Sequence, residues 1–202
     1  MRPDLRIIAE LVRPGARVLD LGCGTGDLLA HLQAHKQVNG YGLEIDPANI
    51  TTCLDKGVNV LEQNLDEGLT NFPDDSFDMV VMTETLQSVR RPRDMLDEML
   101  RIGRECVVTF PNFGHWRCRL QLSLHGRMPV ARHLPHSWYD TPNIHLCTFN
   151  DFEQLCRTKG LPIIERFVVD ARHSNKALLN RFPNVFGTYA FYRLGRPGAG
   201  AS

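Results

Sequence analysis

Val18-Leu19-Asp20-Leu21-Gly22-Cys23-Gly24-Thr25-Gly26 is the stretch that decides the fold of this chain. Val18 and Leu19 favour a strand, and the alternating glycines that follow allow a tight turn and let a ligand approach the bare backbone. Asp27 to Leu32 then begin a helix. A strand, a glycine turn and a helix N-terminus together make a site for the polar part of a nucleotide-like ligand, and the alternative is a turn that only joins the two elements.

Two carboxylates indicate which ligand the turn suits. Gly22 and Gly24 match the dinucleotide fingerprint G-x-G-x-x-G, but Asp27 stands where the third glycine would be. A carboxylate there would repel a pyrophosphate, which disfavours a nicotinamide oxidoreductase. Asp20, at the end of the strand, could hold a cationic group. An adenosine joined to a cationic arm, as in S-adenosylmethionine, therefore suits this loop better than a dinucleotide does.

Composition excludes several other classes. The chain has 202 residues, of which 43% are hydrophobic, and its 23 basic side chains balance 23 acidic ones, so a globular protein without a nucleic-acid partner is expected. None of the cysteines forms a C-x-x-C pair or lies at metal-ligand spacing with a histidine, which predicts reduced thiols and no metal site. No apolar run approaches the ~20 residues of a membrane helix, and the start of the chain is unlike a signal peptide. We therefore expect a cytoplasmic protein without a membrane partner.

Alternating short strands and helices predict an α/β, doubly wound, Rossmann-like fold with a mostly parallel sheet. The expected strands are 17–21, 40–45, 58–62, 77–82, 105–110, 162–169 and 185–194, with an antiparallel pair at the end. The expected helices are 3–12, 27–34, 47–56, 93–102 and 148–159, the last capped by Asn150 with Glu153. We expect a single domain over 1–195, in which 111–146 is a lid or interface insertion, and a disordered tail over 196–202.

The ends of successive strands supply further candidate binding residues. Glu44 could accept hydrogen bonds from ribose hydroxyls, or be a solvated carboxylate. Ile45 could cover an adenine ring, or pack in the core. Asp66 could accept a hydrogen bond from the adenine amine, or belong to a simple turn, and Thr83 could line the methionine arm. The predicted cofactor-binding residues are Asp20, Gly22, Cys23, Gly24, Gly26, Glu44, Ile45, Asn64, Leu65, Asp66 and Thr83.

A second group of candidates follows the fourth and fifth strands, where arginine and both tryptophans of the chain gather. Arginine and aromatic residues are typical of interfaces and lids, and a structural flap packed on the sheet is the alternative. The predicted substrate or partner surface is Gln87, His115, Trp116, Arg117, Trp138 and Tyr139. No catalytic base is predicted, because methyl transfer from a sulfonium is an in-line displacement that positioning can drive.

Several motifs resemble known families. Val18–Gly26, Tyr41–Asp46 and Asn64–Asp78 are similar to the cofactor motifs of the class I S-adenosylmethionine-dependent methyltransferases. Four later segments resemble the MetW family of methionine biosynthesis proteins, so that the likeness extends to about Arg196. These segments are Thr85–Pro92, Phe110–Arg117, Gly126–Val130 and Trp138–Cys147.

The resemblance implies a seven-stranded class I methyltransferase fold whose last strand is antiparallel. It also implies a bacterial cytoplasmic protein that acts with homoserine O-acyltransferase (MetX). S-adenosylmethionine or S-adenosylhomocysteine would be held by Asp20, Gly22, Gly24, Gly26, Glu44 and Asp66. Gln87 stands where methyltransferases often have histidine, which weighs against ordinary small-molecule catalysis. A partner or regulator of the acyltransferase is the leading hypothesis, and a methyltransferase acting on an unidentified small molecule is the alternative.

Overall fold

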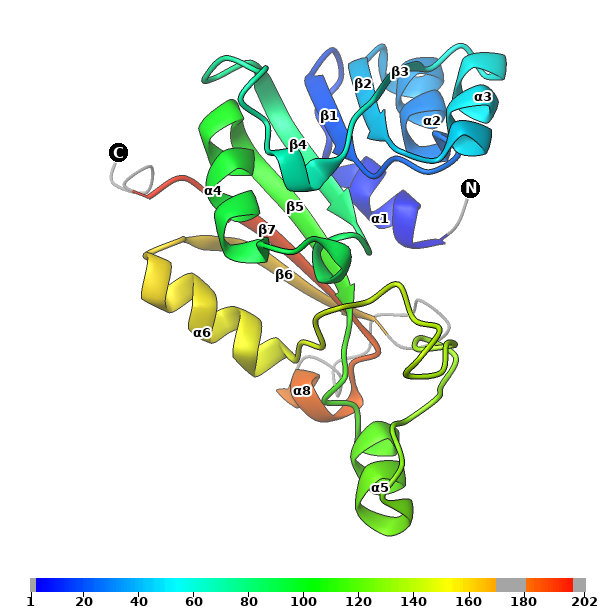
Figure 1. Ribbon diagram of the computed structural model, residues 1–202. Coiled ribbons are helices and arrows are strands. Elements are labelled where there is room, and N and C mark those ends of the chain that lie inside the picture. Colours follow the sequence, from blue (N-terminus) through cyan, green and yellow to red (C-terminus); the bar gives the residue numbers. More distant parts are fainter. Residues whose placement is uncertain (1–2, 170–180, 198–202) are drawn as a thin grey trace.

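Apolar strands alternate with helices along most of the chain, and the strands assemble into one sheet (Figure 1). The computed structural model describes residues 3–169 and 181–197. The sheet has seven strands in the order β3-β2-β1-β4-β5-β7-β6. They are β1 (Arg17–Leu21), β2 (Asn39–Glu44), β3 (Asn59–Glu62), β4 (Phe77–Thr83), β5 (Gly103–Pro111), β6 (Ile163–Val169) and β7 (Tyr189–Gly195).

Strand direction confirms the predicted fold class. The strands β1 to β5 pair in parallel. The strand β7 lies antiparallel between β5 and β6. The sheet is therefore mostly parallel with its last strand antiparallel, as the sequence predicts. Most of the predicted link between β6 and β7 falls in 170–180, outside the described residues.

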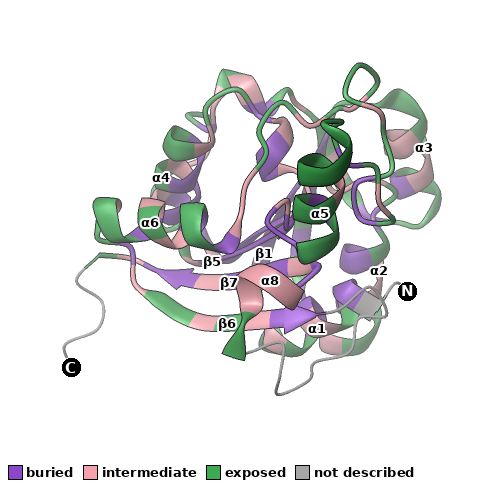
Figure 2. Ribbon diagram, turned by 90° about the horizontal axis from the view of Figure 1, so that it is seen from below, coloured by how far each residue is buried: buried purple, intermediate pink, exposed green. Residues whose placement is uncertain are grey.

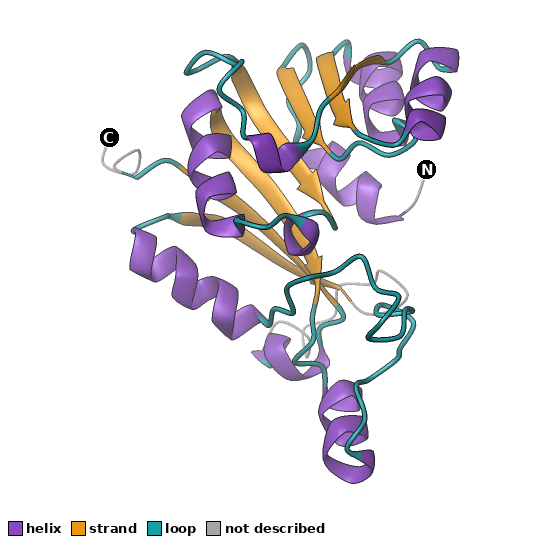
Figure 3. Ribbon diagram, in the orientation of Figure 1, coloured by secondary structure: helices purple, strands orange, loops and turns teal. Residues whose placement is uncertain are grey.

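Helices cover both faces of the sheet, and each face has its own apolar core (Figure 3). The alternation of β4 shows the division, because successive strand residues point to opposite faces. Val80 and Met82 pack in the core that includes residues of α4 and α6, whereas Met79 and Val81 pack in the core that includes residues of α1, α2 and α3. The helices are α1 (Pro3–Leu11), α2 (Asp27–Lys36), α3 (Pro47–Asp55), α4 (Pro92–Ile102) and α6 (Phe149–Lys159).

The cap of α6 differs from the prediction. Thr148 is the N-cap: its hydroxyl accepts a hydrogen bond from the Asp151 amide at 3.3 Å, and the Asp151 carboxylate accepts one from the Thr148 amide at 3.1 Å. The predicted pair of Asn150 and Glu153 is therefore wrong by two residues. Glu153 instead accepts a hydrogen bond from the Tyr192 hydroxyl at 3.0 Å.

The end of the chain also corrects two predictions. The strand predicted from residue 185 begins at Tyr189, because Pro183–Phe186 form a short helix, α8. Arg196, predicted to lie in a disordered tail, donates hydrogen bonds to the carbonyls of Leu100 at 2.7 Å and Gly103 at 3.1 Å. It thereby satisfies carbonyls left free at the end of α4. The rest of the predicted tail, 198–202, lies outside the described residues.

The segment 111–146, predicted to be a lid or interface insertion, contains a helix, α5 (Trp116–His125), that the sequence pattern does not predict. Its amphipathic signal is weak because Leu120, Leu122 and Leu124 are spaced by two and so lie on both sides of the helix. Cys118 is the one residue of the helix that is buried. The helix extends away from the sheet, and Figure 2 shows it almost entirely exposed. Within the described ranges, no helix is both long and apolar enough to cross a membrane.

Candidate functional site

The glycine loop joins β1 to α2 beside the end of β2, where the amides of Gly22 and Cys23 donate to the Leu43 carbonyl at 2.9 and 3.0 Å. Gly22 and Gly24 have positive φ angles of 71° and 54°, which favour glycine. A Cβ on Gly22 would lie 2.7 Å from the Thr85 hydroxyl oxygen, so β4's exit loop already fills that space. A Cβ on Gly24 would meet nothing within 4 Å. The loop thus leaves open space at Gly24 for a ligand to approach.

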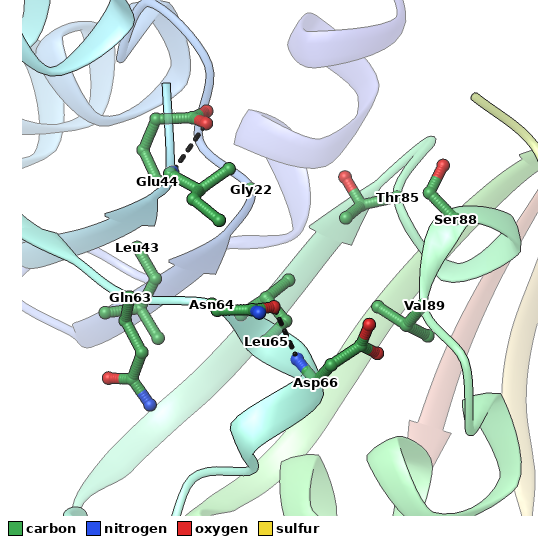
Figure 4. A pocket seen from close by; sticks show the side chains of 11 residues that line it. Gly22, Leu43, Glu44, Gln63, Asn64, Leu65, Asp66, Thr85, Ser88 and Val89 are labelled. Carbon is green, nitrogen blue, oxygen red and sulfur yellow. Dashed lines mark hydrogen bonds between the residues drawn. The ribbon is translucent and has the colours of Figure 1, made fainter. Parts of the chain in front are cut away.

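A cavity of about 250 Å³ lies at the carboxyl edge of the sheet (Figure 4). It brings together six of the predicted cofactor-binding residues: Gly22, Glu44, Ile45, Asn64, Leu65 and Asp66. Five further lining residues are not predicted from the sequence: Leu43, Gln63, Thr85, Ser88 and Val89. Open α/β sheets bind ligands at this edge. Thr85, Ser88 and Val89 could therefore have been predicted from their position directly after β4.

Glu44 is buried, and its carboxylate is largely occupied by backbone donors. One oxygen accepts hydrogen bonds from the amides of Ile45 at 2.8 Å and Asp46 at 3.0 Å, and the other accepts one from the Gly24 amide at 2.8 Å. A carboxylate offers about four acceptor positions. Glu44 therefore fixes the glycine loop against β2 and keeps about one position for a ligand hydroxyl, rather than the two that a ribose diol would use.

The short 3-10 turn η1 (Leu65–Glu67) carries the next lining residues. The Asn64 side chain caps this turn by accepting a hydrogen bond from the Asp66 amide at 3.0 Å. The Asp66 carboxylate accepts one from the Arg90 amide at 2.8 Å, which connects the turn to the segment after β4. Asp66 is therefore no simple turn residue. Ile45 is 57% exposed at the mouth of the cavity, so the alternative of core packing is wrong for it.

Asp20 and Thr83 do not line this cavity; they are placed at the ends of adjacent strands, β1 and β4. Asp20 is 3% exposed, and its Oδ1 has no hydrogen-bond partner among the described residues. Burial, with repulsion from Glu44, raises the pKa of Asp20 from 3.8 to about 7. The Thr83 hydroxyl is likewise buried without a partner in that part of the chain. Buried polar groups of this kind are expected to have partners, and a cation would suit the Asp20 carboxylate.

The thiol of Cys23 also lies away from the cavity. Its Sγ is 3.9 Å from Sγ of Cys53, which donates a hydrogen bond to the Gly24 carbonyl at 3.2 Å. Burial raises the pKa of the Cys23 thiol, so the thiol stays protonated and packs against Cys53. Cys23 can therefore contribute only its backbone to a ligand site.

Two of the residues predicted for the substrate or partner surface are buried. Gln87, in the 3-10 turn η2 (Leu86–Ser88), donates from Nε2 to the Glu84 carbonyl at 2.6 Å. Its main-chain carbonyl accepts hydrogen bonds from the amides of Ile144 and His145, both at 3.0 Å. These long-range partners explain why a polar residue lies inside, which local sequence does not indicate.

His115 is the second buried residue, because it caps α5: its Nδ1 accepts a hydrogen bond from the Arg117 amide at 3.3 Å. Burial lowers the pKa of His115 to about 4, so the ring is neutral near pH 7. The other predicted surface residues are exposed: Trp116, Arg117, Trp138 and Tyr139. The Arg117 guanidinium lies 5.3 Å from the centre of the Trp116 ring.

Comparison with solved structures agrees with this architecture. The S-adenosylmethionine-dependent methyltransferase from Mesorhizobium loti superposes with a TM-score of 0.69 at 17% identity, covering 96% of each chain. At that identity the likeness shows a shared fold, which is the class I methyltransferase fold.

Sequence comparison gives closer relationships. The bifunctional methionine biosynthesis protein MetXA/MetW of Rhodopirellula baltica is 33% identical over 205 residues, covering 96% of this chain and 33% of that protein. The ubiquinone/menaquinone biosynthesis C-methyltransferase UbiE of Ectopseudomonas mendocina is 36% identical over 119 residues, covering 52% of this chain and 45% of that protein. The chain thus spans less than half the length of either relative. A family model described as "Methionine biosynthesis protein MetW" matches residues 2–194, and the chain therefore belongs to the MetW family.

Proposed function

We propose that this chain is a methionine biosynthesis protein that binds S-adenosylmethionine and acts as a partner or regulator of homoserine O-acyltransferase. The choice of ligand is supported above all by the buried Asp20 carboxylate at the carboxyl end of β1, one oxygen of which has no hydrogen-bond partner among the described residues. A cationic arm would give this carboxylate the opposite charge that it lacks. S-adenosylmethionine combines such an arm with an adenosine that the adjoining cavity suits.

Each part of the site has a role in this proposal. Asp20 and Thr83 would face the methionine arm. Glu44 would accept a hydrogen bond from one ribose hydroxyl while it continues to hold the glycine loop. Ile45 and Val89 would cover the two faces of the adenine, and Asp66 would accept a hydrogen bond from its amine. The bound ligand supplies a sulfonium methyl group, and the surrounding residues bind and orient it.

The acyltransferase role is supported by the relative from Rhodopirellula baltica, whose name joins MetXA and MetW in one bifunctional protein. Since that relative carries both parts in one chain, we propose that the corresponding separate proteins associate with each other. A cytoplasmic location, without membrane or nucleic acid as partner, belongs to the same proposal.

The test is calorimetry of S-adenosylmethionine binding, followed by acyltransferase assays with and without this protein and the ligand. We expect binding that Asp20→Asn weakens at least tenfold, and a change in acyltransferase activity when this protein is added. Asp78→Asn is the matched control, because Asp78 lies at the amino end of β4, away from the carboxyl edge of the sheet, and pairs with Arg17. Normal ligand binding by Asp20→Asn, or an acyltransferase indifferent to this protein, would contradict the corresponding half of the proposal.

The second candidate is an active methyltransferase acting on a small molecule. It is favoured by two buried oxygens, the Thr83 hydroxyl at the end of β4 and Gln87 Oε1 in the segment that follows. Neither has a partner within the described residues, and both could accept a hydrogen bond from the molecule that receives the methyl group. Glu84, between them, has a φ of 52°, and strained residues of this kind gather at functional sites. Formation of S-adenosylhomocysteine with a candidate acceptor, reduced in Gln87→Leu, would support it, whereas binding without turnover across a broad acceptor screen would oppose it.

A further inference from the structure

Three apolar side chains of the helix α5 form an exposed stripe. Trp116, Leu120 and Leu124 follow one another at intervals of four, which places them on one side of the helix. They are 41%, 47% and 68% exposed. A helix this exposed gains little from packing on its own molecule, and exposed apolar patches mark interaction sites.

The base of α5 is nevertheless firmly held. Asn112, fully buried, donates a hydrogen bond to the Gly187 carbonyl at 2.8 Å and accepts one from the Gly114 amide at 2.9 Å. Arg119 donates to the Gly114 carbonyl at 2.6 Å, and His133 Nε2 lies 3.3 Å from the Asn112 carbonyl oxygen. The stripe is therefore presented on a fixed support, which lowers the entropy lost when a partner binds it.

The charge around the stripe has one sign. From Asn112 to Tyr139 the sequence contains no aspartate or glutamate, although the whole chain is balanced. Arg117, Arg127 and Arg132 lie in this range, and none of them forms an ion pair with a carboxylate in the described part of the chain. The segment that carries the stripe is thus basic, and these three arginines have no acidic partner among the described residues.

This pattern decides between a second copy and a different partner. A symmetric dimer through α5 would bring the same arginines of two chains together, and like charges repel. A partner with a negative surface would instead neutralise them and speed association. An apolar groove receives a helical stripe of this spacing, so the complementary surface is an apolar groove with acidic edges.

We infer that α5 is the docking helix by which this chain binds homoserine O-acyltransferase, with Trp116, Leu120 and Leu124 inserted into an apolar groove whose edges are acidic. This inference rests on the proposed function for the identity of the partner. Within the bifunctional relative from Rhodopirellula baltica, the two parts belong to one chain, which would raise their effective concentration and make such a contact easy to form. Arg117, stacked on Trp116, would pair with a carboxylate at the groove edge.

The test measures the affinity of purified homoserine O-acyltransferase from the same organism for wild-type protein and two variants. The first variant is Leu120→Glu/Leu124→Glu. The matched control is Leu54→Glu, because Leu54 is 62% exposed and belongs to α3, a helix that lies far from α5 in Figure 1. Since these leucines are exposed, both variants should fold, which circular dichroism and S-adenosylmethionine binding check.

We expect the double variant to lose at least about tenfold in affinity, as is common for central interface residues. The control should bind like wild type, and Arg117→Glu should slow association and reduce its dependence on salt. Wild-type binding that the double variant retains in full would refute the docking helix and leave the proposed function standing. No binding by the wild type would refute both.

Two other occupants are distinguished in the same series. Sedimentation would reveal a wild-type dimer that the double variant converts to monomer. Vesicles of anionic phosphatidylglycerol would reveal binding that the double variant abolishes. Either result, with unchanged acyltransferase affinity of the double variant, overturns the inference.

Discussion

Asp20→Asn should make the protein more stable while it weakens ligand binding. Asparagine has nearly the same shape as aspartate but carries no charge. Asp20 is buried, and its pKa is raised from 3.8 to about 7. In the folded protein the carboxylate therefore stays protonated over a range of pH in which the unfolded chain has already lost the proton.

The sign of the effect follows from this difference in proton binding. Because the raised pKa lets the folded state bind more protons, the contribution of Asp20 to stability is fully present below pH 3.8 and is lost as pH rises through about 7. Each pKa unit corresponds to about 1.4 kcal/mol. The full difference in pKa amounts to ~4 kcal/mol of lost stability at pH 8, and the loss at pH 5 is ~1.5 kcal/mol.

The assay is urea unfolding of wild type and Asp20→Asn at pH 5 and pH 8, without ligand. The advantage of the variant should grow by ~2.5 kcal/mol between the two pH values. Any contribution that does not depend on pH, such as a hydrogen bond of the new amide, cancels in this comparison. Asp78→Asn is the control: the hydrogen bond from the Arg17 amide lowers the Asp78 pKa, so this carboxyl is ionised in both states from pH 5 to 8. Its effect should be the same at both pH values.

Ligand binding gives the second readout of the same substitution. Wild-type affinity for S-adenosylmethionine should fall as pH decreases below about 7, because a proton then competes with the cationic arm for Asp20. The variant should bind at least tenfold more weakly at pH 8 and show a flat pH profile. An equal stability difference at pH 5 and pH 8 would refute the reasoning, because it would mean that Asp20 does not titrate in this range.

Three further perturbations follow from the structure. Gly24→Val should abolish S-adenosylmethionine binding measured by calorimetry, since it strains a φ of 54° and fills the open space beside the loop; unchanged affinity would oppose a ligand at Gly24. Thr148→Ala should cost ~1 kcal/mol in urea unfolding through loss of the α6 cap, whereas Asn150→Ala should have little effect, and the reverse ranking would contradict the cap assignment. The lowered pKa of His115 means that its stabilising effect, complete above pH 6.5, is lost as pH falls through about 4. Hydrogen exchange of the Arg117 amide, corrected for its intrinsic rate, should show that α5 opens more readily as pH falls through this range in wild type. The His115→Asn variant should show no such change, because asparagine can cap the helix but does not titrate.

The strands and the glycine loop could be predicted from sequence because their signals are local. The nearly continuous apolar run from Phe77 to Met82 indicates a strand buried on both faces, and this signal does not depend on knowing the residues packed against it. Local sequence does not indicate an environment that distant residues create. Gln87 is buried because Ile144 and His145 reach its carbonyl, and Arg196 is ordered because α4 ends beside it.

The candidate site shows the same division. Glu44 and Asp66 were predictable from their places after strands, but their actual hydrogen bonds were not. The Asp66 carboxylate accepts a hydrogen bond from the Arg90 amide. The Glu44 carboxylate accepts hydrogen bonds from three backbone amides even without a ligand. The helix α5 escaped prediction for a different reason: Leu120, Leu122 and Leu124 are spaced by two, so its apolar residues lie on both sides and show no clear helical period.

The Gln87 carbonyl has a thermodynamic consequence for any function that uses both regions. Ser88 and Val89, which follow Gln87 in the chain, line the cavity. The two amides that donate hydrogen bonds to the Gln87 carbonyl belong to segment 111–146, which carries α5. One oxygen atom thus connects the segment that lines the cavity to the segment that carries the proposed docking helix. Should S-adenosylmethionine tighten acyltransferase binding by some factor, a closed cycle of equilibria requires the acyltransferase to tighten S-adenosylmethionine binding by the same factor. The enzyme would then set how much of the metabolite this protein retains, as much as the metabolite would report on the pathway to the enzyme.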